Sequence, residues 1–156
     1  MNARDHFSVG TPSLLKDKYV VYFTKGVDQK GFRWEANRRY NEFFSLREKM
    51  ATSWPGLYIP WIPGKKLLGN RDVKFIVERR YFLERFYMQM SRFEYLLYGQ
   101  EWQIFCRPSD KPKDGDITQQ IKNYPQLQYQ QMLQNYMSVF YVSEEQLKSL
   151  HDPKSR

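Results

Sequence analysis

The hydrophobic pattern of this chain changes period at Tyr40, and that change limits the folds open to it. Residues 32–37 alternate between apolar and polar side chains, which is the period-two pattern of a strand with one buried face. Residues 43–50 instead carry apolar side chains three and four positions apart, which indicates a helix of about three turns. The face of the strand predicted to point inward carries Phe32, Trp34 and Ala36. Strands that precede helices in this way predict an α+β fold.

Residues 18–37 have the composition of a β-hairpin. Tyr19–Phe23 is rich in β-branched and aromatic residues, and Gly26–Gly31 supplies the residue types that turns require. A further strand near Phe7–Val9 is indicated more weakly. We therefore expect a small antiparallel sheet in the first quarter of the chain.

Two segments after residue 50 are organised by prolines and by helical periodicity. Three prolines between residues 54 and 66 exclude a helix there and favour polyproline II. Residues 71–92 carry the strongest helical pattern in the chain, and Glu101–Cys106 predicts a short helix that turns Trp102 and Phe105 inward. The predicted apolar stripe of the long helix consists of Phe75, Ile76, Phe82, Leu83, Phe86 and Met90.

Positive charge is concentrated in the first two thirds of the chain. The 156 residues include 25 Lys and Arg against 17 Asp and Glu, a net charge of +8. Residues 108–156 hold six bases and six acids, so the whole excess lies in residues 1–107. Such an excess favours an anionic partner, which could be a nucleic acid, an acidic protein or a membrane surface.

Several classes of protein and of site are disfavoured by composition. No apolar run reaches the roughly 18 to 20 residues of a membrane span, and no apolar segment follows the charged residues 1–6 as a secretory signal would need. The single Cys106 allows no internal disulfide or zinc site and fits a cytoplasmic protein. We predict no metal and no cofactor.

Arg79 lies within the apolar stripe of the predicted long helix, where a cation is unexpected. Arginine is seldom buried without a partner. One explanation is a structural salt bridge with Glu35 or Glu48, and another is snorkelling to the surface. The third is that the stripe opens into a pocket where Arg79 meets an anionic ligand.

Two other basic groups could contribute to such a pocket. Arg38-Arg39-Tyr40 lies where the hairpin ends, and Lys65-Lys66 follows the proline-rich segment. A phosphate is held by several converging donors, and a tyrosine offers a flat face to a sugar or cyclitol ring. Spacing alone does not establish that these groups converge.

Three motifs in these same segments resemble those of PX (phox homology) domains. Arg39–Leu46 resembles the R-[Y/F]-x-x-F-x-x-L signature, Ile59–Lys65 resembles the P-x-x-P loop with its trailing lysine, and Phe75–Phe86 resembles the F-I-x-E-R-x-x-x-L-x-x-F helix. They occur in the right order between about residues 7 and 107. The resemblance implies a three-stranded antiparallel sheet packed against a helical subdomain, with a phosphoinositide pocket between them.

The resemblance also implies a role for each matching residue. Arg39 would hold the 3-phosphate and Tyr40 would stack against the inositol ring. Lys65 would meet the 1-phosphate, and Arg79 would bind the hydroxyl groups at positions 4 and 5. All four residues match the family pattern, which implies phosphatidylinositol 3-phosphate as the ligand. No residue has a catalytic role, and the protein is predicted not to be an enzyme.

The loop after the proline-rich segment is implied to enter the membrane. This assigns membrane insertion to Leu67 and Leu68, with Trp61 beside them, although ordinary burial against the long helix is the alternative. A preference for a bisphosphorylated lipid also stays open, because other bases could accommodate a second phosphate. These bases are Arg38, Lys66, Arg71, Lys74 and Arg80.

Residues 108–116 combine proline, glycine and charge, which indicates a linker to a helical extension over 117–156. That extension could fold back on the PX core or lead to a further module. Within it, Ser143–Gln146 resembles a capping box before a last short helix. Sorting nexins commonly follow their PX domain with a helical BAR domain. The resemblance therefore implies a longer parent protein, a homo- or heterodimer through that downstream domain, and a peripheral position on the cytosolic face of endosomal membranes.

The main rival is a basic nucleic-acid-binding domain, since Arg, Lys, Tyr and Phe interleave through residues 32–50 and 71–98. The aromatic residues of those segments alternate into a core face, which disfavours a nucleic-acid partner. An enzyme acting on phosphorylated substrates is disfavoured because the chain has no glycine-rich phosphate loop and no Cys-Arg phosphatase loop.

Overall fold

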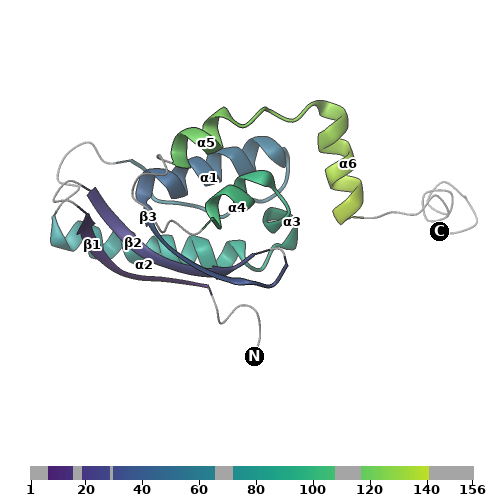
Figure 1. Cartoon of the computed structure of the whole chain (residues 1–156). Helices are drawn as coiled ribbons and strands as arrows, with labels where there is room; N and C mark the ends of the chain where they lie inside the picture. Colours follow the sequence, from purple (N-terminus) through teal and green to yellow (C-terminus); the bar gives the residue numbers. More distant parts are fainter. Residues whose placement is uncertain (1–6, 16–18, 29, 66–71, 108–116, 141–156) are drawn as a thin grey trace, which may run out of the picture. The chain divides into compact units, whose positions relative to one another are not determined.

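A three-stranded antiparallel sheet forms the N-terminal part of the structure, which is a computed structural model and describes residues 7–15, 19–28, 30–65, 72–107 and 117–140. Strands β1 (Ser8–Leu15), β2 (Tyr19–Val27) and β3 (Arg33–Arg39) lie side by side in that order (Figure 1). The predicted hairpin is β2 and β3, and the weakly indicated first strand is longer than expected. The α+β prediction is confirmed.

The turn between β2 and β3 explains one wrong prediction. The side-chain oxygen Oδ1 of Asp28 accepts hydrogen bonds from the backbone N–H groups of Lys30 and Phe32, each at 2.9 Å. Gly31 has a φ of +84°, a conformation that other residues rarely adopt. Because Phe32 still belongs to this turn, its side chain is 65% exposed, and the buried alternation starts only with Trp34 and Ala36.

Four helices follow between residues 40 and 105. They are α1 (Tyr40–Ser53), α2 (Val73–Met90), α3 (Glu94–Leu97) and α4 (Gln100–Phe105). The helices predicted at residues 40–50, 71–92 and 101–106 correspond to α1, α2 and α4, whereas the single turn of α3 was not predicted. Residues 54–65 contain neither helix nor strand, as their prolines require.

The buried face of α2 is rotated slightly from the predicted stripe. Leu83, Phe86 and Met90 are fully buried as expected, and so is Tyr87, which the stripe omitted. Phe82 was predicted to be buried but is 39% exposed. Its ring packs edge-on against Trp61 of the proline-rich segment, with 5.4 Å between centroids, so it covers that segment instead of entering the core.

We call Trp34, Tyr87, Trp102 and Phe105 the core cluster. They come from β3, α2 and α4, and their ring centroids lie 5.8 to 6.5 Å apart, mostly in tilted or edge-to-face pairs. Gly26 of β2 lies against it, because a Cβ at that position would collide with Tyr87 and press on Trp34. Packing of this cluster therefore joins the sheet to the helices.

The compact unit that contains the sheet extends to Pro125. Helix α5 (Ile117–Asn123) belongs to it and packs on α1 and α4 (Figure 1). Ile121 is buried there, and Nζ of Lys49 donates to the carbonyl oxygen of Tyr124 at 2.5 Å. Residues 117–123, the start of the predicted C-terminal extension, thus make their contacts within the sheet-bearing unit.

Helix α6 (Tyr129–Val139) belongs to a second unit, Gln126–Arg156, in which it is the one described helix. The predicted linker at 108–116 and the predicted last helix after Ser143 lie outside the described residues. Within the described ranges no helix has the length and hydropathy needed to span a bilayer.

Candidate functional site

Arg79 projects from α2 into a space between two aromatic rings. Its guanidinium carbon lies 3.7 Å from the ring centroid of Tyr40 and 4.3 Å from that of Phe75. The residue is only 7% exposed, and its Nη2 donates a long hydrogen bond of 3.4 Å to the carbonyl oxygen of Gly64. Its Nε has no hydrogen-bond partner in the described part of the chain.

Neither predicted acid accounts for this buried cation. Among the residues that the structure describes, no carboxylate pairs with Arg79, so Glu35 and Glu48 are excluded as its salt-bridge partners. Burial lowers the pKa of Arg79, and the phenol groups of Tyr40 and Tyr22 partly offset that effect. The guanidinium is therefore held by cation–π contacts and one carbonyl, which leaves donor capacity for an anion or a polyol.

The proline-rich segment is attached to α1 at two points. The Tyr40 hydroxyl donates to the carbonyl oxygen of Pro63, and Nε of Arg47 donates to that of Pro60 at 2.9 Å. Ile62 between them is buried. Together with the contact from Arg79 to Gly64, these bonds fix the backbone directly before Lys65.

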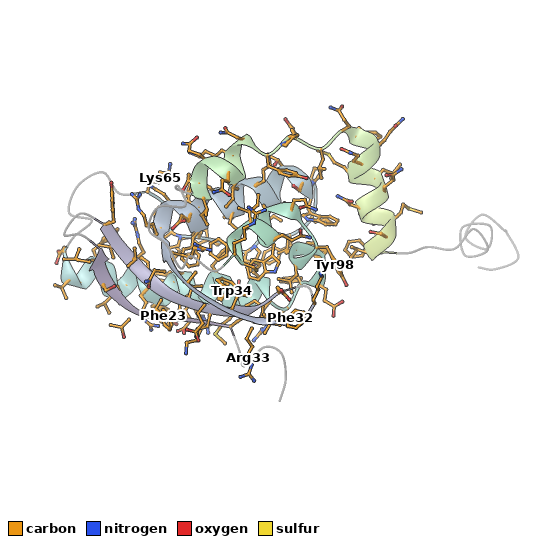
Figure 2. The ribbon with its side chains drawn as sticks, in the orientation of Figure 1. Phe23, Phe32, Arg33, Trp34, Lys65 and Tyr98 are labelled. Carbon is orange, nitrogen blue, oxygen red and sulfur yellow. The ribbon has the colours of Figure 1, made fainter. Side chains whose placement is uncertain are left out.

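Lys65 lies at the surface (Figure 2), and its ammonium group is 4.5 Å from the ring centroid of Phe44. The Phe44 ring is in turn 6.0 Å from that of Tyr40. We call Tyr40, Phe44, Lys65, Phe75 and Arg79 the cation–aromatic corner. It brings together three of the four predicted headgroup residues from α1, α2 and the proline-rich segment.

Arg39, the fourth, is the residue that caps the N-terminus of α1. Its backbone is extended, and its N–H donates to Oε1 of Glu42 at 2.6 Å, as in a capping box. Its guanidinium carbon lies 3.9 Å from the ring centroid of Tyr19 in β2. Arg39 is therefore next to the cation–aromatic corner in sequence, since it precedes Tyr40, while its side chain packs on Tyr19 of the sheet.

Two of the bases considered for a second phosphate bind other groups of the protein. Arg38 is 1% exposed, and its Nε and Nη2 donate to the carbonyl oxygen of Phe105 at 3.1 and 2.8 Å. Arg80 donates to the carbonyl oxygen of Val9 at 2.7 Å and pairs with Glu84. Strand alternation explains the first outcome, because neighbouring residues of β3 point to opposite faces.

Of the remaining candidates, Lys74 is exposed at the start of α2. Lys66, Arg71 and the two insertion residues Leu67 and Leu68 lie outside the described residues.

The sequence patterns did not assign to the site three aromatic rings that contact its cations. Phe75 and Phe44 lie four residues before Arg79 and four residues after Tyr40, so helical spacing could have indicated both. Tyr19 meets Arg39 through the pairing of β2 with β3, where Val21 is opposite Arg39. Nothing local in the sequence indicates that contact.

Residues 27–109 of the chain match the family model described as PX domain. The X-ray structure of a designed CISK-PX domain is similar to this one with a TM-score of 0.55 at 27% sequence identity, covering 64% of this chain and 96% of that structure.

Two curated relatives extend this similarity. Human sorting nexin-8 is 31% identical over 90 residues, which make up 58% of this chain and 19% of that protein. Vacuolar protein sorting-associated protein vps5 of Schizosaccharomyces pombe is 45% identical over 47 residues, 30% of this chain and 8% of that protein. The chain thus spans less than a fifth of the length of either relative.

Proposed function

Because the chain belongs to the PX domain family, we propose that it is a phosphoinositide-binding module that targets membranes in protein sorting, with phosphatidylinositol 3-phosphate as its lipid. The observation that carries this proposal is Arg79, a buried guanidinium that has no carboxylate partner among the described residues and lies on Tyr40 in the motif positions of the family. Burying an unpaired cation costs stability. A site that binds an anionic, hydroxyl-rich ligand gives a reason for that cost.

The headgroup would bind residues from the end of β3, from α1 and α2, and from the proline-rich segment. Arg39 would contact the 3-phosphate and Lys65 the 1-phosphate, and the unpartnered donors of Arg79 would meet the ring hydroxyls. Tyr40 can offer its ring to the inositol only if the Arg79 guanidinium shifts along it. The hydrogen bond that opposes this shift is the 3.4 Å contact with Gly64, which is long and therefore weak.

The surroundings of Arg79 support a preference for a single ring phosphate. Its described neighbours are the rings of Tyr40 and Phe75 and the backbone of Gly64. Arg38 and Arg80, two of the bases considered for a second phosphate, bind backbone carbonyls elsewhere. A phosphate at position 4 or 5 would lose its hydration without gaining a second cation, and that exchange is unfavourable.

The lipid would place this module on the cytosolic face of endosomal membranes as a peripheral protein. Leu67 and Leu68 would add an apolar contact with the bilayer, and each buried leucine contributes about 1.5 to 3 kcal/mol. A dimer built through a helical domain further along a longer parent protein would present two headgroup sites and raise avidity.

Sedimentation of the protein with phosphatidylcholine liposomes, with and without phosphatidylinositol 3-phosphate, tests the proposal. We expect the wild type to bind only liposomes that contain the phosphoinositide, and Arg39→Ala to lose that binding while its melting temperature hardly changes. Arg92→Ala, at an exposed arginine of the same charge, is the control. Equal sedimentation of wild type and Arg39→Ala would contradict the assigned role of Arg39.

A panel of mono- and bisphosphorylated phosphoinositides decides between the two lipid preferences. Tight binding of a bisphosphorylated lipid would show that further bases, such as Lys74, Lys66 or Arg71, supply a second phosphate site. Competition by a DNA or RNA duplex that displaces the protein from liposomes would favour the nucleic-acid alternative instead.

The double change Leu67→Glu with Leu68→Glu tests membrane insertion separately. It should weaken binding to liposomes and leave binding of a soluble short-chain phosphatidylinositol 3-phosphate intact. If both are lost, the two leucines are structural.

A further inference from the structure

Arg38 and Glu42 form a buried pair directly beneath the residue proposed to hold the phosphate. Arg38 Nη1 lies 4.0 Å from Glu42 Oε2, and the two side chains are 2% and 8% exposed. Arg38 also donates to the carbonyl oxygens of Phe105 and Arg107 at the end of α4. The pair therefore connects the start of α1 to the end of α4.

Glu42 has a second contact that bears on the site. Its other oxygen, Oε1, accepts the backbone N–H of Arg39 at 2.6 Å, so the carboxylate fixes the backbone that carries the Arg39 side chain. The same contact brings a negative charge next to the residue proposed to bind an anion. The Debye length is about 8 Å at physiological salt, and buried charges such as the Glu42 carboxylate are screened much less than exposed ones.

Arg38 compensates for that charge without facing the ligand. Burial lowers its pKa and the neighbouring Glu42 partly restores it, so the two charges interact. Its guanidinium is fixed by three donated hydrogen bonds and turned into the core, where it cannot reach a headgroup.

We infer that Arg38 and Glu42 are a positioning pair for the headgroup site, in which Glu42 fixes the Arg39 backbone and Arg38 cancels the repulsion that this carboxylate would exert on a bound phosphate. The inference rests on the proposed function and adds two residues to it. It also gives the two adjacent arginines at the end of β3 separate roles. Arg39 binds the ligand, and Arg38 pairs with the carboxylate that fixes the Arg39 backbone.

Substitutions at the two members of this pair should change the affinity for the headgroup in opposite directions. Glu42→Gln retains an oxygen that can accept from Arg39 and removes the negative charge, so soluble inositol 1,3-bisphosphate should bind about two- to threefold more tightly. Arg38→Gln removes the positive charge that faces the carboxylate and should weaken that binding about fivefold, roughly 1 kcal/mol. Both variants should melt at a lower temperature than the wild type.

Titration calorimetry on the full chain, with circular dichroism melts, separates this role from a structural one. If the pair were only structural, both substitutions would lower affinity. Changes in affinity of opposite sign, with the same loss of stability in both variants, require the electrostatic role. Arg38→Lys keeps the charge but loses the forked geometry, and should bind at least threefold more tightly than Arg38→Gln. Glu94→Gln and Arg92→Gln, both at exposed positions, match the two changes in net charge.

If Arg38→Gln does not fold, Glu42→Gln against Glu94→Gln still decides the question. Weaker binding by Glu42→Gln than by the wild type would overturn the inference, and so would equal binding by Glu42→Gln and Glu94→Gln. Wild type that binds neither inositol 1,3-bisphosphate nor phosphatidylinositol 3-phosphate vesicles would overturn the proposed function and this inference with it.

Discussion

The core cluster and the cation–aromatic corner are both built from aromatic rings, yet they pack in different ways. In the core cluster ring meets ring, and all four residues are buried. In the corner cation meets ring, with Arg79 on Tyr40 and Lys65 on Phe44, and the edge toward Lys65 is open to solvent. Aromatic content alone therefore does not distinguish a core from a site.

This contrast separates the residues that stabilise the fold from the residues that are proposed to bind the ligand. Ring-on-ring packing gains free energy on folding, since it removes large apolar surfaces from water. A cation placed on a ring in a half-open corner gains less, because it gives up hydration, but it stays able to bind an anion. Substitutions in the two clusters should accordingly affect different measurements.

The largest effect is expected from Trp102→Ala in the core cluster. Trp102 is fully buried and packs on Phe7, Trp34, Tyr87 and Phe105. Its removal should lower the free energy of unfolding by about 3 to 5 kcal/mol, measured by urea denaturation. Trp102→Phe should lose much less, and a loss under about 1 kcal/mol for the alanine variant would mean that the cluster does not support the fold.

Glu101 makes the core side of the molecule sensitive to pH. Burial raises its pKa from 4.5 to about 7, with Lys49 opposing the rise. The folded state therefore holds the proton more tightly than the unfolded state, so the contribution of Glu101 to stability is greatest below pH 4.5 and is lost as pH rises toward 7. The fall should approach roughly 3 kcal/mol. Thermal melts of wild type and Glu101→Gln across this range test it, and parallel curves would contradict the assignment.

Arg79→Met should reverse the pattern of Trp102→Ala. Methionine fills the space between Tyr40 and Phe75 without a charge, so stability should stay the same or increase. Binding to vesicles that contain phosphatidylinositol 3-phosphate should weaken about thirtyfold, near 2 kcal/mol. A variant that melts much lower and still binds as the wild type does would place Arg79 in the core instead of the site.

The smallest effect is expected at the boundary between the two clusters. Phe82 is partly exposed and covers Trp61, whereas Leu83 beside it is fully buried. Phe82→Ala should cost less than about 1 kcal/mol, and Leu83→Ala about 2 to 5 kcal/mol. Equal losses of stability in the two variants, measured by thermal denaturation, would show that Phe82 contributes to the core as much as Leu83 does.

Most of the fold follows from local pattern, and the two residues wrongly predicted to be buried share one cause. Phe32 and Phe82 are large apolar residues next to correctly predicted positions, and both are exposed. Phe32 is one residue before β3 begins, inside a turn set by Asp28. Phe82 lies at the margin of a stripe whose centre depends on what packs against α2. Periodicity indicates that a face exists, and packing partners decide where its edges lie.

Local pattern was enough to predict the order of the main strands and helices and the break at the prolines, because these depend on backbone propensity or on neighbours a few positions away. The resemblance to a family, not local pattern, supplied the four proposed headgroup residues. The folded arrangement was needed to show that Arg38 turns to the end of α4 while Arg39 packs on Tyr19, and that Arg79 lies on Tyr40 with no acid beside it in the described part of the chain. Those contacts join residues up to 69 positions apart. The free energy of a buried charge is set by every group around it in space, and that surrounding is assembled only when the chain folds.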